Sequence, residues 1–316
     1  MMTASDFSHL SVLPAETITC LAPGTGGIYL DGTVGGGGHA GLILEASNPD
    51  GRLIGLDRDP DALQHAAKVL APYGARVSLH HACFADLATI LDDLGIPAVD
   101  GILFDLGVSS WQLDTAQRGF SFRQDGPLDM RMDPTQGESA ADIVNHRDEA
   151  ELVRIFREYG EERFAGRIAR KIVEIRRATP FTRTTELAEM VRNGVPGGKI
   201  PARIHPATRI FQALRIEVNK ELEQVKRGIS TAFQRLKVGG RLAIISFHSL
   251  EDRIVKQAFV ELSKGCNCPP KLPLCVCGKS PAAELLTRRG IKGAVADSDN
   301  PRARSAVLRA IRKLCN

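Results

Sequence analysis

Residues 29–41 read Tyr-Leu-Asp-Gly-Thr-Val-Gly-Gly-Gly-Gly-His-Ala-Gly. A short apolar run leads into the four consecutive glycines, and residues 41–46 after them are typical of a helix. Glycines let a ligand approach the backbone closely, and the first turn of a helix offers N–H groups without intrahelical partners. The stretch therefore predicts a nucleotide-binding turn between the first strand and the first helix of an α/β sheet.

Strand-like and helix-like runs alternate on either side of this turn. We predict strands at residues 28–30, 52–56, 76–80 and 99–105, with a helix at residues 60–70. Because strands that alternate with helices form right-handed crossovers, the pattern predicts a parallel sheet in an α/β fold. Sheets of this kind bind their ligands at the carboxyl ends of the strands.

The α/β pattern stops near Asp114 and resumes after Pro206. Between these points, apolar residues recur at spacings of three and four, which is typical of helices. A single long helix is expected from Pro206 towards Leu236, before the next strand. We therefore expect a discontinuous α/β domain, residues 1–113 and 207–316, interrupted by a helical domain at residues 114–206.

Three aspartates stand where predicted strands end, Asp31, Asp57 and Asp105. In a parallel sheet these ends share one edge, so we expect the three carboxylates to lie near the glycine-rich turn. NAD would bring a pyrophosphate, which favours glycine backbone and helix N-termini. S-adenosylmethionine (SAM) would bring a sulfonium and an ammonium group, which favour carboxylates. The acidic edge therefore favours SAM over NAD.

Six longer runs of the sequence are similar to a known family. They are Asp31-Gly-Thr-Val-Gly-Gly-Gly-Gly-His39, Gly55-Leu-Asp-Arg-Asp59, Asp105-Leu-Gly-Val-Ser-Ser110, Arg118-Gly-Phe-Ser-Phe-Arg-Gln-Asp-Gly-Pro-Leu-Asp-Met-Arg-Met-Asp133, His205-Pro-Ala-Thr-Arg-Ile-Phe-Gln-Ala-Leu-Arg-Ile-Glu-Val-Asn219 and Ser246-Phe-His-Ser-Leu-Glu-Asp-Arg253. Across nearly the whole chain, the sequence resembles the ribosomal RNA small subunit methyltransferase H family. The resemblance implies a class I SAM-dependent methyltransferase with a Rossmann-like sheet, which methylates N4 of a cytosine in the decoding region of bacterial 16S rRNA.

The resemblance also implies which residues bind the cofactor. It places Gly37, Gly38 and His39 on the methionine side of SAM, Asp57 on the ribose and Phe84 beside the adenine, with Asp105 and Gln112 completing the pocket. The implied partner is 16S rRNA or the small ribosomal subunit. Monomer and homodimer both stay open.

Methylation of a cytosine amine requires particular side chains, because the lone pair of N4 is delocalised into the ring. A residue that accepts hydrogen bonds from the amine would localise that pair, and Asp105 and Ser109 are the candidates. Phe247 is the candidate for stacking on the base. His248 is the candidate for accepting the proton that the amine loses, since imidazole titrates near neutral pH. A purely structural histidine is the alternative.

Charge is unevenly distributed along the chain. Residues 1–100 hold 12 acidic and 4 basic side chains, although the whole chain has a net charge of +4. Basic residues gather at 161–215 and 286–316, which favours an anionic partner such as nucleic acid. The expected RNA contacts are Arg163, Arg167, Arg170, Lys171, Arg176 and Arg177. A solvated helix surface is the alternative.

The composition limits the class of protein to which the chain can belong. The chain is 43% hydrophobic and 25% charged, as globular proteins are. It contains no apolar run of about 20 residues and no signal peptide, so we expect a cytoplasmic protein without a membrane span. Two other functions stay open from the residues alone: an RNA-binding assembly factor without catalysis, and an NAD-dependent oxidoreductase.

Four of the seven cysteines are clustered, at Cys266, Cys268, Cys275 and Cys277. A disulfide framework is not expected in a cytoplasmic chain. Two Cys-x-Cys pairs on a proline-rich segment can supply the four thiolates of a structural Zn²⁺ site. Zinc and four unliganded thiols are both left open by the sequence.

Overall fold

The computed structural model describes residues 11–196, 205–266, 268 and 277–315. No helix among these residues combines the length and the apolar character that a membrane span requires. The chain forms two compact units: unit 1 is Met1–Gly107 with Leu222–Asn316, and unit 2 is Val108–Glu221. The expected insertion at residues 114–206 lies within unit 2, which extends further at both ends.

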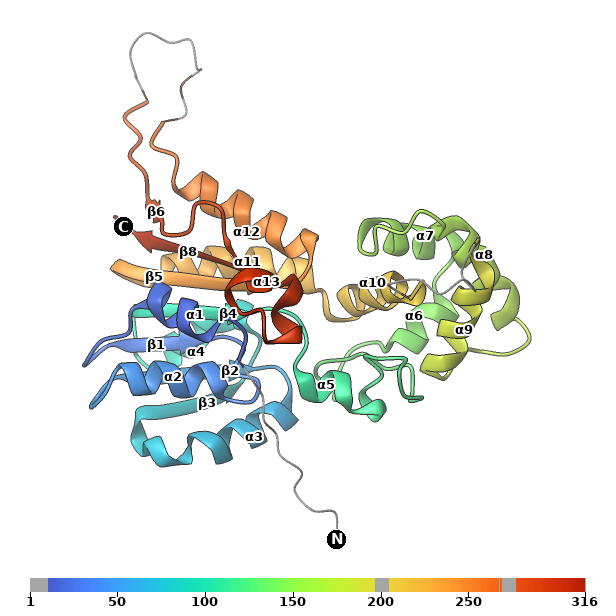
Figure 1. Ribbon diagram of the computed structural model, residues 1–316, viewed down its shortest axis with the longest axis horizontal. Coiled ribbons are helices and arrows are strands. Elements are labelled where there is room, and N and C mark those ends of the chain that lie inside the picture. Colours follow the sequence, from blue (N-terminus) through green and yellow to red (C-terminus); the bar gives the residue numbers. More distant parts are fainter. Residues whose placement is uncertain (1–10, 197–204, 267, 269–276, 316) are drawn as a thin grey trace. The chain divides into compact units, whose positions relative to one another are not determined.

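Unit 1 is built on one mixed β-sheet with the strand order β3-β2-β1-β4-β5-β8-β6, and β7 pairs with β8 (Figure 1). The parallel strands are β1 (Ile28–Asp31), β2 (Arg52–Asp57), β3 (Val77–His81), β4 (Val99–Asp105) and β5 (Leu236–Ser246). The antiparallel part comprises β6 (Ala283–Leu285), β7 (Ile291–Lys292) and β8 (Val307–Lys313). The predicted α/β fold with a mainly parallel sheet is confirmed.

Helices cover both faces of this sheet. One core contains residues of α1 (Pro14–Leu21), α2 (Gly38–Ala46) and α3 (Pro60–Leu70), and the other contains residues of α4 (Leu87–Asp93), α11 (Glu221–Gln234) and α12 (Ser249–Leu262). Successive side chains of a strand point to opposite faces, so Leu103 joins the first core while Ile102 and Phe104 join the second. Burial on both faces explains why β4 is apolar at consecutive positions.

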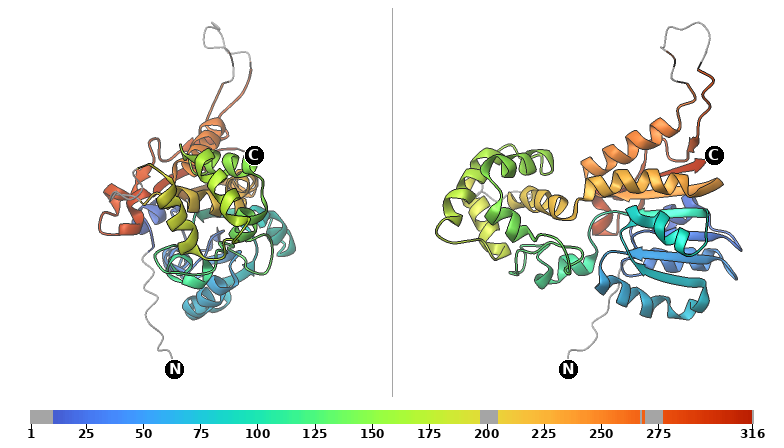
Figure 2. Two further views of the ribbon diagram at one scale, coloured as in Figure 1. Left: turned by 90° about the vertical axis from the view of Figure 1, so that its right-hand side faces the viewer. Right: turned by 180° about the vertical axis from the view of Figure 1, so that it is seen from behind.

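Unit 2 is helical, and its green and yellow helices pack against one another in both views of Figure 2. The helices are α5 (Ser110–Asp114), α6 (Ala140–His146), α7 (Glu149–Glu158), α8 (Ala165–Arg176), α9 (Thr184–Gly194) and α10 (Ala207–Asn219). Leu152, Phe156, Ile168 and Ile172, which set the predicted helical period, are all buried in the core of this unit. The sequence pattern therefore identified the buried faces of α7 and α8.

One predicted helix is wrong. The apolar spacing predicts a continuous helix from Pro206 towards Leu236, but α10 ends at Asn219 and α11 begins at Glu221. Between them, Lys220 has a φ of 53°, which is the left-handed conformation and ends a right-handed helix. The helical region also ends slightly earlier than predicted: α11 ends at Gln234, and Leu236 is already the first residue of β5.

Candidate cofactor and active site

Three of the predicted site residues lie at the carboxyl end of the sheet in unit 1. Asp31, Asp57 and Asp105 are the last residues of β1, β2 and β4, and β1 lies between the other two strands. Asp31 pairs in register with Gly55 of β2 and Leu103 of β4. The parallel topology thus brings three carboxylates to the edge where the strand order reverses, the usual ligand site of such sheets.

The glycine-rich turn is held by hydrogen bonds to both neighbouring strands. The backbone N–H of Gly35 donates to Oδ2 of Asp57 at 2.8 Å, and the N–H of Asp105 donates to Oγ1 of Thr33 at 2.6 Å. The N–H of Thr33 donates to Oδ1 of Asp31 at 3.0 Å. Thr33 was not identified from the sequence as a residue that holds this turn. The sequence offers one indication of that role, the position of Thr33 two residues after the strand-end Asp31.

The turn leads directly into a helix N-terminus. α2 begins at Gly38, three residues before the predicted start at Gly41. Gly37 precedes it with a φ of 86°, a conformation that residues with a side chain rarely adopt. A Cβ at Gly37 would also lie 3.4 Å from the side chain of Leu70. Gly37 has no side chain that could cap the first N–H groups of α2. These groups can therefore donate hydrogen bonds to an anionic group such as a carboxylate.

His39 connects this helix to the strand ends. It lies in the first turn of α2 and is buried, with Nε2 at 3.7 Å from Oδ2 of Asp105. The structure thus brings together four of the predicted cofactor residues, Gly37, Gly38, His39 and Asp105, beside the strand-end Asp57.

Burial raises the pKa of all three strand-end carboxyl groups. Loss of solvation raises the pKa of Asp31 to about 7, despite the hydrogen bond from the backbone. The same cause raises the pKa of Asp57 to about 6, against two backbone hydrogen bonds. The pKa of Asp105 is raised well above its ordinary value, first by burial and then by the negative charges of Asp31 and Glu251. A cation in this place would favour the ionised carboxylates.

Two buried carboxylate oxygens have no hydrogen-bond partner among the described residues, Oδ2 of Asp31 and Oδ1 of Asp105. Such an atom costs free energy unless a ligand or water satisfies it. SAM carries an ammonium donor and a positive sulfur, so its chemistry matches these oxygens. A pyrophosphate would add negative charge beside them. The residues present therefore fit SAM.

Phe84 lies in η2 (Phe84–Asp86), which follows β3. Its ring centroid is 4.7 Å from that of Phe104, and the two rings are tilted by 42°. A Cβ added to Gly228 of α11 would lie 2.6 Å from the Phe84 ring, so this glycine is needed for the close approach. The Phe84 ring therefore packs against Phe104 and against the backbone of α11 at Gly228. The contact with adenine stays a prediction.

Ser109 and Gln112 belong to unit 2, where the structure gives both a local role. Ser109 is the N-cap of α5, and its hydroxyl accepts a hydrogen bond from the N–H of Gln112 at 3.2 Å. In return, Oε1 of Gln112 accepts from the N–H of Ser109 at 3.0 Å. This reciprocal pair is a capping box. Their predicted contacts with the cytosine amine and with SAM stay predictions.

Phe247 and His248 follow the carboxyl end of β5 in unit 1. A Cβ at Gly107 would lie 3.3 Å from the Phe247 ring, so the ring packs over the chain that leaves β4. His248 is the N-cap of α12: its Nδ1 accepts from the N–H of Glu251 at 3.4 Å, and its Nε2 lies 3.2 Å from Oε1 of Glu251. The imidazole therefore has a structural role, and proton transfer by His248 stays a prediction.

The basic residues expected to contact RNA lie on or beside α8 in unit 2. Arg167 and Arg177 are exposed and have no ion-pair partner among the described residues. Three others have neighbours at the surface: Arg163 over Phe164, Arg170 with Glu149, and Lys171 with Glu174. Arg176 differs, because it donates to the carbonyl of Val144 at 2.7 Å and so supports the unit internally.

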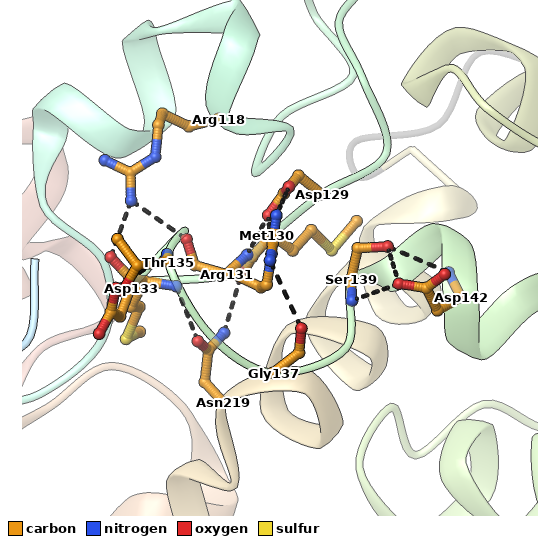
Figure 3. A network of polar contacts seen from close by, with 11 residues as sticks. Arg118, Asp129, Met130, Arg131, Asp133, Thr135, Gly137, Ser139, Asp142 and Asn219 are labelled. Atoms are coloured by element: carbon orange, nitrogen blue, oxygen red, sulfur yellow. Dashed lines mark hydrogen bonds and ion pairs between the residues drawn. The ribbon is translucent and has the colours of Figure 1, made fainter.

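The run at residues 118–133 folds into a loop within unit 2 (Figure 3). Arg118 donates to the carbonyls of Arg131 at 3.1 Å and Met132 at 2.8 Å. Asn219 of α10 accepts from the N–H of Met132 and donates to the carbonyl of Met130, each at 2.8 Å. Between these bonds, Met130 has a φ of 64°, which is uncommon for a residue with a side chain. This run therefore includes a strained backbone held by buried polar groups.

The fold and the site together define a class I SAM-dependent methyltransferase: an open sheet with an antiparallel strand near one edge, whose first strands end in aspartates around a glycine-rich turn. The chain belongs to the MraW methylase family, whose model matches residues 6–314. The predicted family, fold class and cofactor are confirmed. Membership of a methylase family excludes the NAD-dependent oxidoreductase.

Similar proteins of known sequence carry the name ribosomal RNA small subunit methyltransferase H. The one from Syntrophotalea carbinolica is 59% identical over 314 residues, 99% of this chain and 100% of its own length. Those from Pelobacter propionicus and Geobacter sulfurreducens are 56% and 54% identical over 98% of this chain and 99% of their own. Among solved structures, an rRNA methylase from Streptococcus thermophilus is similar with a TM-score of 0.40 and 12% identity. The match covers 96% of this chain and 93% of the methylase chain. The family assignment does not depend on it.

Proposed function

We propose that this protein transfers a methyl group from SAM to N4 of a cytosine in the decoding region of bacterial 16S rRNA. The observation that carries the proposal is a pair of buried oxygens, of Asp31 and Asp105, that accept no hydrogen bond from the residues described by the structure, in a chain that matches its relatives from end to end. The names of those relatives support small-subunit rRNA as the substrate. The reaction would take place in the bacterial cytoplasm, with 16S rRNA or the small subunit as partner.

The first task of the protein is to bind and orient the cofactor. Bound SAM supplies a methyl group that its positive sulfur has already activated. Asp31 and the glycine-rich turn hold the methionine part, Asp57 accepts hydrogen bonds from the ribose, and Phe84 lies against the adenine. Well-oriented reactants gain up to roughly 7 to 11 kcal/mol from proximity, so positioning supplies most of the acceleration.

The second task is to make the cytosine amine reactive. β4 and β5 are neighbours, and they bring the Asp105 carboxylate and the Phe247 ring to the same edge of the sheet. In the proposed mechanism, Asp105 accepts a hydrogen bond from N4 while Phe247 stacks on the base. Ser109 is a second acceptor. At Nδ1, His248 receives the proton that N4 loses, after this nitrogen releases the N–H of Glu251. Because the cytosine must leave its base stack, an exposed base is the favoured substrate.

Unit 2 is proposed to recognise the RNA around the cytosine. Exposed Arg167 and Arg177 on and beside α8 are available for phosphates, together with the partly paired Arg170 and Lys171. Contacts with phosphates give affinity without sequence preference. Selection of one cytosine would then depend on the shape of the RNA and on the active site.

The function is tested with small subunits from a bacterial strain that lacks the gene for this protein. The purified protein and methyl-labelled SAM should transfer label to 16S rRNA, and nucleoside mass spectrometry should identify N4-methylcytidine at one site. Asp31→Asn should reduce incorporation strongly, while Asp93→Asn, an exposed aspartate of α4, should not. Label in a different nucleoside contradicts the proposal. Binding to rRNA without transfer supports the assembly factor instead.

The role of His248 needs a variant that separates capping from proton transfer. Asparagine is a good N-cap, so His248→Asn retains an acceptor for the N–H of Glu251 but cannot take up a proton at neutral pH. A proton acceptor predicts a lower kcat in His248→Asn with an unchanged Tm. An unchanged kcat in His248→Asn, with a lowered Tm in His248→Ala, would assign the residue to the helix cap alone.

A further inference from the structure

Three cysteines meet in unit 1, on the connection between α12 and β6. The Sγ atoms of Cys266, Cys268 and Cys277 all lie within 4.8 Å of one another. Those of Cys266 and Cys277 are 3.6 Å apart although the residues are 11 positions apart in the chain. The cluster therefore joins two neighbouring cysteines with a third that is distant in the chain.

The distances between these sulfurs match a tetrahedral metal site. Zinc binds thiolate sulfur at about 2.3 Å, so two sulfurs of a tetrahedral site lie about 3.8 Å apart. A disulfide would require about 2.05 Å, far less than the 3.6 Å between Cys266 and Cys277. The N–H of Cys268 donates to Sγ of Cys266 at 3.3 Å. A hydrogen bond to sulfur favours the thiolate, which is the form that binds metal.

Packing does not account for this cluster. Cys266 and Cys277 are exposed, whereas Cys20 is buried in the core of unit 1. Free cysteines are usually buried like small apolar residues. Among the described residues, no core cluster includes any position between Leu262 and Ala283. Thiols that meet at an exposed site outside every core need another reason to converge.

The base of the connection is already closed by the backbone. The N–H of Ala282 donates to the carbonyl of Leu262 at 2.9 Å, and the N–H of Leu314 donates to the carbonyl of Ala282 at 2.8 Å. Beyond this point, the described residues up to β6 form no helix or strand. Lys279 adds a tether to α12, since its Nζ lies 3.3 Å from Oε1 of Glu261. A metal bound by the cysteines would add a second cross-link between the two described segments of chain, at Cys266 and Cys277.

We propose that Cys266, Cys268 and Cys277 bind a structural Zn²⁺ ion as thiolates. Zinc suits the site because soft sulfur ligands in a tetrahedral arrangement favour it, and because it needs no redox partner. The sequence also places Cys275 two residues before Cys277, the spacing that separates Cys266 from Cys268. Cys275 lies outside the described residues, so the proposal rests on the other three. The ion stabilises the connection and takes no part in methyl transfer.

Metal analysis of the full chain tests this proposal. Protein purified without chelators from zinc-supplemented cells should contain about one zinc per chain, as a closed structural site does. The double variant Cys266→Ser, Cys277→Ser should lose at least about nine-tenths of it, since it removes two thiolate ligands. The matched control is Cys315→Ser, an exposed cysteine outside the cluster, which should keep its zinc. Circular dichroism and SAM calorimetry check that both variants fold.

A spectrum of the wild-type chain tests the ligands without any variant. Replacement of zinc by Co²⁺ should give sulfur-to-cobalt charge-transfer bands together with the strong visible bands of tetrahedral Co²⁺. This result stands even where the double variant does not fold. The proposal is overturned by wild-type protein that stays well below one zinc per chain after incubation with zinc chloride. Equal zinc in the double variant, a Co²⁺ spectrum without thiolate bands, or bound iron in place of zinc would overturn it as well.

Discussion

Burial of Asp31 makes the stability of the folded chain depend on pH. Asp31 is 1% exposed, and burial raises its pKa to about 7, while that of Asp57 is raised to about 6. A carboxyl group whose pKa is higher in the folded chain binds protons more tightly there than in the unfolded chain. Between pH 4 and pH 7 the folded state therefore holds more protons, and the free energy of unfolding falls as pH rises. Without cofactor, we expect the Tm to decrease from pH 5 to pH 7.5, as measured by calorimetry.

Saturating SAM should reduce this decrease, because its positive charge favours the ionised carboxylates. S-adenosylhomocysteine, which lacks the sulfonium charge, is the matched ligand and should reduce it less. The affinity for SAM should also rise with pH over the same interval, with protons released on binding. An unchanged Tm between pH 5 and pH 7.5 in the free protein would contradict the assigned pKa shifts.

Replacing Asp31 by Asn separates the charge of this residue from its shape. The amide oxygen can still accept the hydrogen bond from the N–H of Thr33, but the buried negative charge is gone. At pH 8 we expect a higher Tm without cofactor and an affinity for SAM about 10- to 100-fold lower, the loss of one charged hydrogen bond. Calorimetry measures both quantities, with Asp93→Asn as the control. Unchanged affinity would remove Asp31 from the cofactor site.

One buried side chain at the end of α10 holds the loop at residues 118–133. Asn219 is 2% exposed and bonds to the N–H of Met132 and to the carbonyls of Met130 and Arg215. Asn219→Ala leaves the buried groups of the loop unpaired, at about 1–3 kcal/mol for each group. We expect the free energy of unfolding to fall by roughly 2–4 kcal/mol in urea titrations.

Gln212→Ala is the control for this change. Gln212 lies on the same helix and donates one hydrogen bond, to the carbonyl of Tyr159 at 3.1 Å. Its loss should cost about 1 kcal/mol, the net value of an ordinary hydrogen bond. Equal effects of the two substitutions would show that Asn219 has no special part in holding the loop.

Local signals predicted the elements that depend on local physics. The apolar runs of β1, β2 and β4 and the glycine-rich turn are visible in sequence, because burial on two faces and positive φ values restrict residue type. The helix break at Lys220 is not visible in sequence, since neither Gly nor Pro marks it. The neighbouring Asn219 forms hydrogen bonds to residues distant in the chain, which no local pattern reveals. One signal was available but interpreted differently: Ser109-Ser-Trp-Gln112 has the Ser-x-x-Gln pattern of a capping box.

The topology of the sheet determines which sequence motifs lie close together in the folded chain. The strand order 3-2-1-4-5 places Asp31, Asp57 and Asp105 on adjacent parallel strands. The position of the ligand site was therefore predictable from strand ends alone. The electrostatic state of that site was not, because the pKa shifts come from burial, which composition does not reveal. Gln112 of unit 2, a predicted cofactor residue, forms a local hydrogen bond with the N–H of Ser109, and the Ser-x-x-Gln pattern does signal this bond.

The uneven charge of the two units predicts how the molecule should respond to salt. The acidic strand ends belong to unit 1, whereas the exposed Arg167 and Arg177 belong to unit 2. Each phosphate contact by a basic residue releases counterions, so the logarithm of RNA affinity falls with the logarithm of salt by about 0.7 to 0.9 per contact. Arg167→Glu with Arg177→Glu should weaken binding of a decoding-region fragment of 16S rRNA and lower this slope by about 1 to 2. Fluorescence anisotropy over a series of KCl concentrations measures the slope.

Arg52→Glu, at an exposed position of β2 in unit 1, is the matched control and should leave the slope unchanged. SAM affinity should be the same in the wild-type protein and in both variants, because none of these residues lies at the strand ends proposed to bind the cofactor. A slope that does not change in the double variant would assign this surface of α8 to solvent and require another part of the chain to bind the RNA.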